Sequence, residues 1–393
     1  MIEVEKVRRE TPGCEEVIHF NNAGASLMPR PVLHTVVQHL QREALIGGYE
    51  AKEEADDRLE QVYQDIAAFI GARPQEIAII ENATRAFDMA FHALPLSAGD
   101  VILTTTTEYG SNYLAYLLVQ QTRGVEVRCI PNAPSGQISL DGLRKMIDDR
   151  TRLISFAHIP TNSGLIQPAE AVGRIAREAG LFFLLDATQS VGQYPIDVSR
   201  IGCHILATTS RKYLRGPRGV GFLYVSEAIL DRLIPPFIDL HAASLTSATT
   251  YAWREDARKF ENWESSIANT LGLGAAVRYA THLGIEAIWK RVHALAASLR
   301  SALQTVPGVR IYDRGEVQGG LVSFTMAGLE PEEIKSRLRE QRINVSTSSR
   351  AGTWLDMEEK GVRAVVRASV HYYNTEEEIQ QFIAALERLR KRG

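Results

Sequence analysis

Short, continuous apolar runs recur along the first 225 residues, and polar segments with helical periodicity lie between several of them. The runs read EIAII, DVILTT, VEVRCI, RLISFAHI, LFFLLDA, HILATT and GVGFLYV. A strand that is apolar on both faces must be covered on both faces, as strands of a parallel sheet between helices are. The sequence therefore predicts an α/β fold built on a mainly parallel sheet, with function at the carboxyl ends of its strands.

The pattern changes after about residue 270, where a long helical stretch leads into shorter, alternating elements and a final helix. That helix opens with Thr375 and Glu378 at the spacing of a capping box. We therefore expect an N-terminal arm over residues 1–20, a large α/β domain over 21–270 and a smaller α+β domain over 271–393.

Composition excludes several classes of protein. The 393 residues carry 44 basic and 47 acidic side chains, a net charge of −3, so no overall field attracts nucleic acid or an acidic membrane. Three widely spaced cysteines fit neither a disulfide framework nor a metal site. The chain has no signal-peptide core and no run of about 18 apolar residues. We expect a cytoplasmic protein without metal, nucleic-acid or membrane partners.

Polar side chains follow four of the predicted strands. Lys212 lies between the last two apolar runs, Asp186 ends LFFLLDA, Tyr109 follows DVILTT, and Asn162 follows RLISFAHI. Each has a structural alternative: Lys212 as a solvated loop cation, Asp186 as a helix cap, Tyr109 as a core or surface ring, and Asn162 as a turn residue.

A fifth strand end, in EIAIIENATRAF, places Asn82, Ala83 and Thr84 at the start of a helix, whose free amides bind phosphate well. A capping role for Asn82 or Thr84 is the alternative. Together, an amine, a carboxylate, an amide, an aromatic ring and a phosphate-binding helix start are the parts of a pyridoxal phosphate site, with the lysine as Schiff-base partner.

The order of the segments NATRAF, TEYGSN, TNSG, DATQSVGQYPIDV, SRKYLRGPRGVGFLYV and VRASVHYYNTEEEI resembles the class V aminotransferase family. This family of fold type I pyridoxal phosphate enzymes includes cysteine desulfurases and isopenicillin N epimerase. The resemblance implies a large domain with a seven-stranded, mainly parallel sheet and a homodimer. It covers nearly the whole chain, and the segment around Lys212 is its most specific part.

The resemblance also assigns roles to individual residues. It makes Lys212 the cofactor-bearing lysine, Asp186 the partner of the pyridine nitrogen and Tyr109 the ring stacked on the cofactor. Further cofactor contacts that it implies are Ala83, Thr84, Asn162, Gln189, Thr209 and Arg211. Arg367, in VRASV, would hold the substrate α-carboxylate with a bidentate guanidinium.

Two departures from cysteine desulfurases affect the predicted reaction. Desulfurases usually carry histidine immediately before the lysine, whereas this chain has Arg211. Their C-terminal loop carries a persulfide-forming cysteine, whereas the corresponding segment here, INVSTSSRAGTWLDMEEKG, has none. Cys14 and Cys203 lie in segments that make poor substitutes.

The segments NNAGASLMP, IGGYEA and FENWE are most similar to the C-S lyases of the ergothioneine pathway. This likeness implies Asn22 and Tyr49 as substrate contacts; a core tyrosine is the alternative for Tyr49. We therefore expect β-elimination from a cysteine conjugate or cysteine sulfoxide, giving pyruvate and ammonia. An aminotransferase or an epimerase is the alternative. A dinucleotide enzyme is excluded, because LGLGAA follows no strand.

Overall fold

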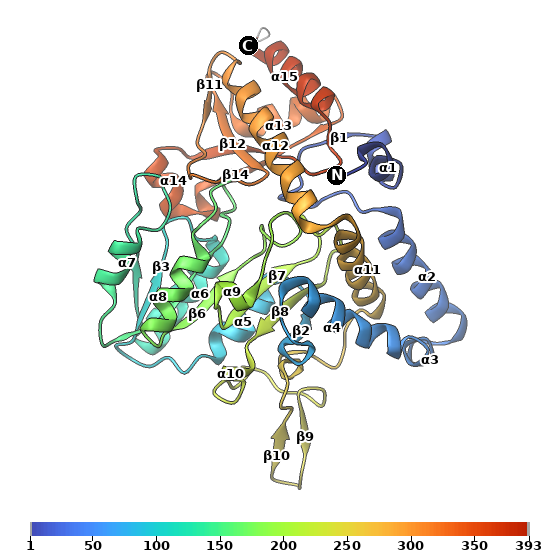
Figure 1. The fold of residues 1–393 in the computed structure, drawn as a ribbon, viewed down its shortest axis with the longest axis vertical. Coiled ribbons are helices and arrows are strands. Elements are labelled where there is room, and N and C mark those ends of the chain that lie inside the picture. The colour runs from blue at the N-terminus through green and yellow to red at the C-terminus, as the bar shows by residue number, and fades with distance from the viewer. Residues whose placement is uncertain (1, 391–393) are drawn as a thin grey trace.

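A seven-stranded sheet forms the centre of the molecule in the computed structural model, which describes residues 2–390 (Figure 1). In spatial order its strands are β2 (Ile77–Ile80), β8 (Gly221–Val225), β7 (Ile205–Thr209), β6 (Phe182–Asp186), β5 (Thr151–Ala157), β3 (Val101–Thr104) and β4 (Glu126–Cys129). Only β8 runs antiparallel to its neighbours. The expected seven-stranded, mainly parallel sheet is thus confirmed.

Helices cover both faces of this sheet, which is why its strands are apolar throughout. In β3, Val101 and Leu103 join one buried cluster while Ile102 joins the other. The first cluster includes α4 (Asp56–Ile70), α7 (Leu140–Met146), α8 (Ala169–Glu178) and α11 (Ile267–Leu283), and the second includes α5 (Ala83–Ala93) and α6 (Gly110–Arg123). The side-chain alternation along a strand therefore divides the core into two layers.

Shorter elements complete the first two thirds of the chain. They are α1 (Val4–Arg9), η1 (Pro12–Glu15), β1 (Ile18–His19), α2 (Arg30–Ile46), α3 (Gly48–Glu53), η2 (Pro74–Glu76), α9 (Val198–Ile201), α10 (Glu227–Leu230) and η3 (Ala257–Phe260). The strands β9 (Ala243–Leu245) and β10 (Tyr251–Trp253) form a hairpin that projects from the body of the molecule (Figure 1).

The C-terminal part contains an antiparallel sheet of β11 (Val309–Ile311), β12 (Leu321–Met326), β15 (Ala364–Ser369) and β14 (Ser346–Ser349), in that order. Its helices are α12 (Ile285–Gln304), α13 (Pro331–Arg339), α14 (Trp354–Lys360) and α15 (Glu376–Arg390), with η4 (Arg350–Gly352) before α14. The expected capping box opens α15, where Thr375 and Glu378 exchange backbone-to-side-chain hydrogen bonds of 3.2 Å. β1 pairs with β13 (Ile343–Asn344), so the N-terminal arm packs on this part.

The helix α12 contributes side chains to two buried cores. Ile288 and Val292 belong to the core of the large sheet, whereas Leu295 and Leu299 belong to the core of the C-terminal sheet. The expected single helical stretch is also broken at Gly284, whose φ of 82° ends α11 and redirects the chain into α12. None of the helices described for residues 2–390 combines the length and the apolar character needed to cross a membrane.

Candidate active site

A cavity of about 360 Å³ opens at the carboxyl ends of the central strands. Its walls are formed by Glu81, Asn82, Ala83, Thr84, Tyr109, Asn112, Ala157, Ile159, Thr161, Asp186, Thr188, Gln189, Thr209, Arg211, Lys212, Arg218 and Gly219. Eight of the residues proposed from the sequence therefore share one cavity, namely Ala83, Thr84, Tyr109, Asp186, Gln189, Thr209, Arg211 and Lys212. This is the edge of a parallel sheet where ligands bind.

Lys212 reaches this cavity from a tight turn between β7 and β8. Arg215 fixes the turn, because its backbone is left-handed (φ 63°) and its buried guanidinium donates to the oxygens of Leu27, Tyr372 and Thr11. Gly192 lies against the turn, and a Cβ there would be 2.4 Å from the backbone at Tyr213. The residues from Lys212 to Pro217 are therefore a buried support rather than a solvated loop, whereas Arg218 and Gly219 are exposed.

The environment of Lys212 favours its neutral amine. Burial, followed by the positive charges of Arg211 and Arg367, lowers the pKa of Lys212 to about 7, although Asp186 opposes this shift. About half of the amines with such a pKa are unprotonated at pH 7, and the unprotonated amine is the form that attacks an aldehyde or accepts a proton.

Asp186 ends β6 and points its carboxylate into the cavity wall without capping a helix. One oxygen accepts a 2.9 Å hydrogen bond from the Thr188 amide, and the other accepts one of the same length from Nδ2 of Asn112. The side chain is buried. A buried carboxylate with two neutral donors is held in one orientation, yet no cation in contact neutralises it, so it suits a cationic ligand group.

The first turn of α5 forms the opposite end of the cavity. Asn82 caps this helix by accepting a 3.0 Å hydrogen bond from the amide of Arg85, which leaves the preceding amides of Ala83 and Thr84 at the cavity. Arg211 and Arg218 line the same cavity. Helix-start amides with two guanidinium groups make an anion site suited to a phosphate.

Asn162 and Gln189 both retain an unused acceptor. The Asn162 amide donates to Oγ1 of Thr353, and Gln189 donates to the carbonyl of Ala23 at 3.2 Å, while Oδ1 of Asn162 and Oε1 of Gln189 are buried without a partner. Thr161 lines the cavity, whereas its neighbour Asn162 does not.

Arg367 extends from β15 of the C-terminal part and is 9% exposed. Its Nε and Nη2 atoms are buried without a hydrogen-bond partner, and burial lowers its pKa to about 10. Since a buried cation without a partner is costly, this guanidinium is suited to an incoming carboxylate.

The structure does not bring Asn22 or Tyr49 to the cavity of the same chain. Asn22 is fully buried and uses its amide internally, donating to the Ser369 carbonyl at 2.7 Å and accepting from Tyr373. Tyr49 lies on α3 with 74% of its surface exposed. This exposure rules out the core alternative for Tyr49, and its substrate role stays a prediction.

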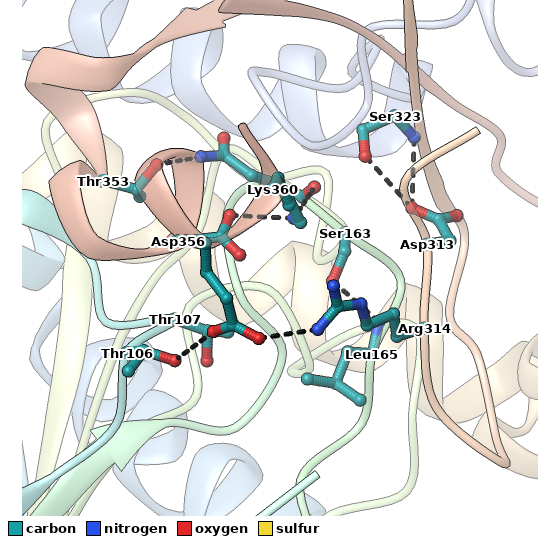
Figure 2. Close-up of polar contacts among 12 residues, drawn as sticks. Thr106, Thr107, Ser163, Leu165, Asp313, Arg314, Ser323, Thr353, Asp356 and Lys360 are labelled. Carbon is teal, nitrogen blue, oxygen red and sulfur yellow. Dashed lines mark hydrogen bonds and ion pairs between the residues drawn. The ribbon is translucent and has the colours of Figure 1, made fainter. Parts of the chain in front are cut away.

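The segment that carries the nucleophile in desulfurases folds here into η4 and α14, which dock on the large domain. Figure 2 shows Thr353, Asp356 and Lys360 facing the loops that carry Thr106 and Ser163. Lys360 pairs with Asp356 at 2.8 Å, and both side chains are buried.

This docking is completed by Glu359, which accepts hydrogen bonds of 3.1 Å from Thr106 and Asn132 and an ion pair of 2.6 Å from Arg314. Gly110 and Gly352 pack so closely that a Cβ on Gly110 would lie 2.5 Å from the Gly352 oxygen. The small domain therefore rests directly beside Tyr109, the N-cap of α6.

No cysteine lies in this segment, and none lines the cavity. Burial raises the pKa of Cys14 to about 11 and that of Cys203 to about 12, and it also raises the pKa of Cys129. All three thiols are therefore poor nucleophiles. Across residues 2–390, no cluster of His, Cys, Asp or Glu has the arrangement of a metal site.

The residues around the cavity fit pyridoxal phosphate. The amine, the carboxylate, the phosphate-ready helix start and the orphaned Oε1 atom of Gln189 lie around one space. The sequence also pointed to Asn82, but it did not reveal other wall residues, among them Asn112 and Arg218. The position of Asn112 in the first turn of the helix that follows β3 was a usable indication.

Comparison with known proteins agrees with this geometry. Residues 18–382 match the family model described as aminotransferase class-V. A probable cysteine desulfurase of Pyrococcus abyssi is 30% identical over 396 residues, covering 98% of each chain. The apo structure of the cysteine desulfurase from Thermococcus onnurineus NA1 superposes with a TM-score of 0.93 at 28% identity, covering 100% of this chain and 99% of that one.

A second structural neighbour is a lyase rather than a desulfurase. The cystine C-S lyase C-DES, solved with its product cysteine persulfide, has a TM-score of 0.87 and 25% identity, covering 96% of this chain and 99% of its own. Another structure of C-DES contains glycine covalently linked to the pyridoxal phosphate cofactor.

Proposed function

The chain belongs to the class-V aminotransferase family and is a pyridoxal phosphate-dependent enzyme of fold type I, and from this premise we propose that it is a cysteine C-S lyase. The finer proposal is β-elimination from a cysteine conjugate or cysteine sulfoxide, with pyruvate and ammonia as products. The observation that carries it is the thiol-free segment at η4 and α14, which stands where a desulfurase presents its nucleophile.

The proposed roles follow from the contacts described above. Thr84, Arg211 and the α5 amides would hold the cofactor phosphate, Asp186 its ring nitrogen, Tyr109 its face and Lys212 its aldehyde carbon. When bound, pyridoxal phosphate supplies an electron sink that stabilises negative charge on the substrate α-carbon. Arg367 would orient the substrate by its carboxylate, as its unpaired guanidinium supports.

Lys212 Nζ is the proposed base, because its low pKa leaves about half of it unprotonated at pH 7. It takes the α-proton of the substrate, and the electron pair of that bond forms a double bond to Cβ. The Cβ–S bond breaks, and its electron pair leaves with sulfur. Water then converts the released 2-aminoacrylate to pyruvate and ammonia, so no protein thiol is needed to accept sulfur.

The decisive experiment is a substrate panel. Purified protein loaded with pyridoxal phosphate is assayed with S-substituted cysteines, their sulfoxides and free cysteine, and pyruvate and ammonia are measured against Lys212→Ala. Equal yields of pyruvate and ammonia from a conjugate support the lyase. Alanine formed from free cysteine would contradict it in favour of a desulfurase. Amino transfer to an added keto acid, or racemised substrate, would favour the aminotransferase or epimerase alternative.

We also propose a cytoplasmic homodimer. α2 leaves an apolar stripe uncovered, with Leu33 and Leu40 45% and 49% exposed, and the β9–β10 hairpin exposes Leu245 and Tyr251. A second copy of the chain would cover such a surface. Light scattering should give twice the mass of 43.6 kDa, and a Leu40→Glu variant should shift it toward the monomer. A monomeric parent protein at micromolar concentration would contradict this.

A further inference from the structure

A second buried carboxyl group, Glu108, lies next to Asp186 and has no part in the reaction above. It directly precedes Tyr109 and is 3% exposed. Its Oε1 accepts a 2.7 Å hydrogen bond from the Tyr109 amide and a 3.0 Å hydrogen bond from Nδ2 of Asn112. The same Asn112 nitrogen donates to Asp186 at 2.9 Å, so one amide group joins the two carboxyl groups.

Among residues 2–390, no cation contacts Glu108. The titratable groups that face it are Asp186 from β6, Tyr116 from α6 and Cys129 from β4, none of which is positive. Two carboxylates sharing a buried donor without a counter-ion do not both stay ionised. Asp186 has two donors at 2.9 Å, whereas Oε2 of Glu108 has only distant hydroxyl neighbours, so the proton belongs on Glu108.

The surroundings of Oε2 provide an acceptor for this proton. The hydroxyl of Tyr116 donates its own hydrogen to Ser155 at 2.7 Å. Its oxygen is therefore free to accept from Oε2 of Glu108, 3.3 Å away. With Tyr116 donating to Ser155, a protonated Oε2 of Glu108 can donate to the Tyr116 oxygen, so these contacts accommodate a proton on Glu108.

We propose that Glu108 is a positioning residue, a neutral carboxylic acid that holds Asn112 against Asp186 and leaves Asp186 as the only charge of the pair. Burial and the neighbouring Asp186 raise the pKa of Glu108 to about 8, in agreement with this geometry. The proposal rests on the proposed cofactor site, because Asp186 is the group that faces the cofactor ring. Neutral Glu108 fixes the direction of that carboxylate without adding a second buried charge.

Infrared spectroscopy of the apoprotein tests the protonation state directly. At pH 7 the parent protein should show the carbonyl band of a buried, protonated carboxyl group, and Glu108→Gln should remove it. Glu126→Gln, which changes an exposed carboxylate on β4, should keep the band. If Glu108→Gln leaves the band intensity unchanged, or the parent has no such band at pH 7, the proposal is overturned.

Cofactor affinity tests the positioning. Glutamine keeps both the acceptor for Asn112 and a donor for Tyr116, so Glu108→Gln should bind pyridoxal phosphate within about threefold of the parent Kd. Glu108→Ala should raise the Kd at least tenfold. Equal weakening by both variants, or none by Glu108→Ala, would overturn the proposal. Neither the infrared band nor the cofactor Kd needs a substrate. Both tests of Glu108 therefore remain valid if no lyase activity is found, and that result would contradict only the proposed reaction.

Discussion

The pKa of Lys212 provides a quantitative test of the site. Burial and two neighbouring arginines lower this pKa from 10.5 to about 7. At pH 7 about half of the Lys212 amines are then neutral, compared with roughly one in three thousand for an ordinary lysine. Burial should therefore raise the concentration of the reactive amine at neutral pH on the order of a thousandfold.

Competitive labelling of the apoprotein measures this directly. An amine-selective reagent is applied from pH 5 to 11 beside a free-amine standard, and labelling of the Lys212 peptide is followed by mass spectrometry. We expect a midpoint near 7. Arg367→Gln should raise it, because a nearby positive charge is removed, and Asp186→Asn should lower it further. A midpoint above about 9 in the parent, or both variants shifting it in the same direction, would refute the electrostatic reasoning.

The lowered pKa of Lys212 should also make the folding stability depend on pH. Between pH 7 and 10.5 unfolded Lys212 binds a proton that the folded protein does not bind, so the free energy of unfolding of the apoprotein should rise with pH across this window. Below pH 7 this cost is fully present and amounts to a few kcal/mol. Lys212→Met removes the titrating group, so urea unfolding at several pH values should show a smaller rise for this variant.

Three further outcomes are expected. Arg367→Ala should reduce kcat/KM roughly 30-fold to several thousandfold at unchanged cofactor content, and Arg367→Lys should restore little of it. The control Arg363→Ala, at an exposed position, should match the parent. Loss of cofactor from Arg367→Ala would contradict the substrate-binding role of Arg367. Lys360→Met leaves the buried carboxylate of Asp356 unpaired and should cost about 3 to 5 kcal/mol in urea unfolding, much of which Asp356→Leu should restore in the double variant. A variant with all three cysteines replaced by serine should keep its lyase activity toward the best conjugate, whereas loss of turnover in a folded variant would implicate a thiol.

The large sheet could be predicted from the sequence, because strands that are apolar on both faces must lie between two layers of helices. The strands are too short and too uniformly apolar for a half-exposed sheet, and Asp186 and Lys212 stand where such strands end. The sequence did not reveal that α12 contributes to two cores, because the apolar periodicity of this helix continues along its length. The helix break at Gly284 was equally hidden, since a single glycine within a periodic pattern does not by itself specify a positive φ.

Only part of the candidate site could be predicted from the sequence. Residues at strand ends were found because the topology gathers them, but contacts that come from elsewhere were not. Asn112 depends on where α6 begins, and Arg218 on how the turn after Lys212 folds back. Asn22 was assigned by likeness alone, and its amide serves to join the N-terminal arm to β15. Tyr49 is exposed on α3, so a substrate contact of Tyr49 would require another molecule to cover this helix.

The choice between lyase and desulfurase depends on one segment rather than on the cofactor site. The residues that activate the α-carbon are compatible with both reactions, which is why relatives with a desulfurase name share nearly the whole chain. The reactions differ in what receives sulfur. In this chain the segment from Arg350 to Lys360 has a structural role, because hydrogen bonds of Thr353, Glu359 and Lys360 hold it on the large domain. This anchored segment has no thiol that could accept sulfur from the substrate. The sulfur atom would then leave together with its own substituent, which favours elimination over persulfide formation.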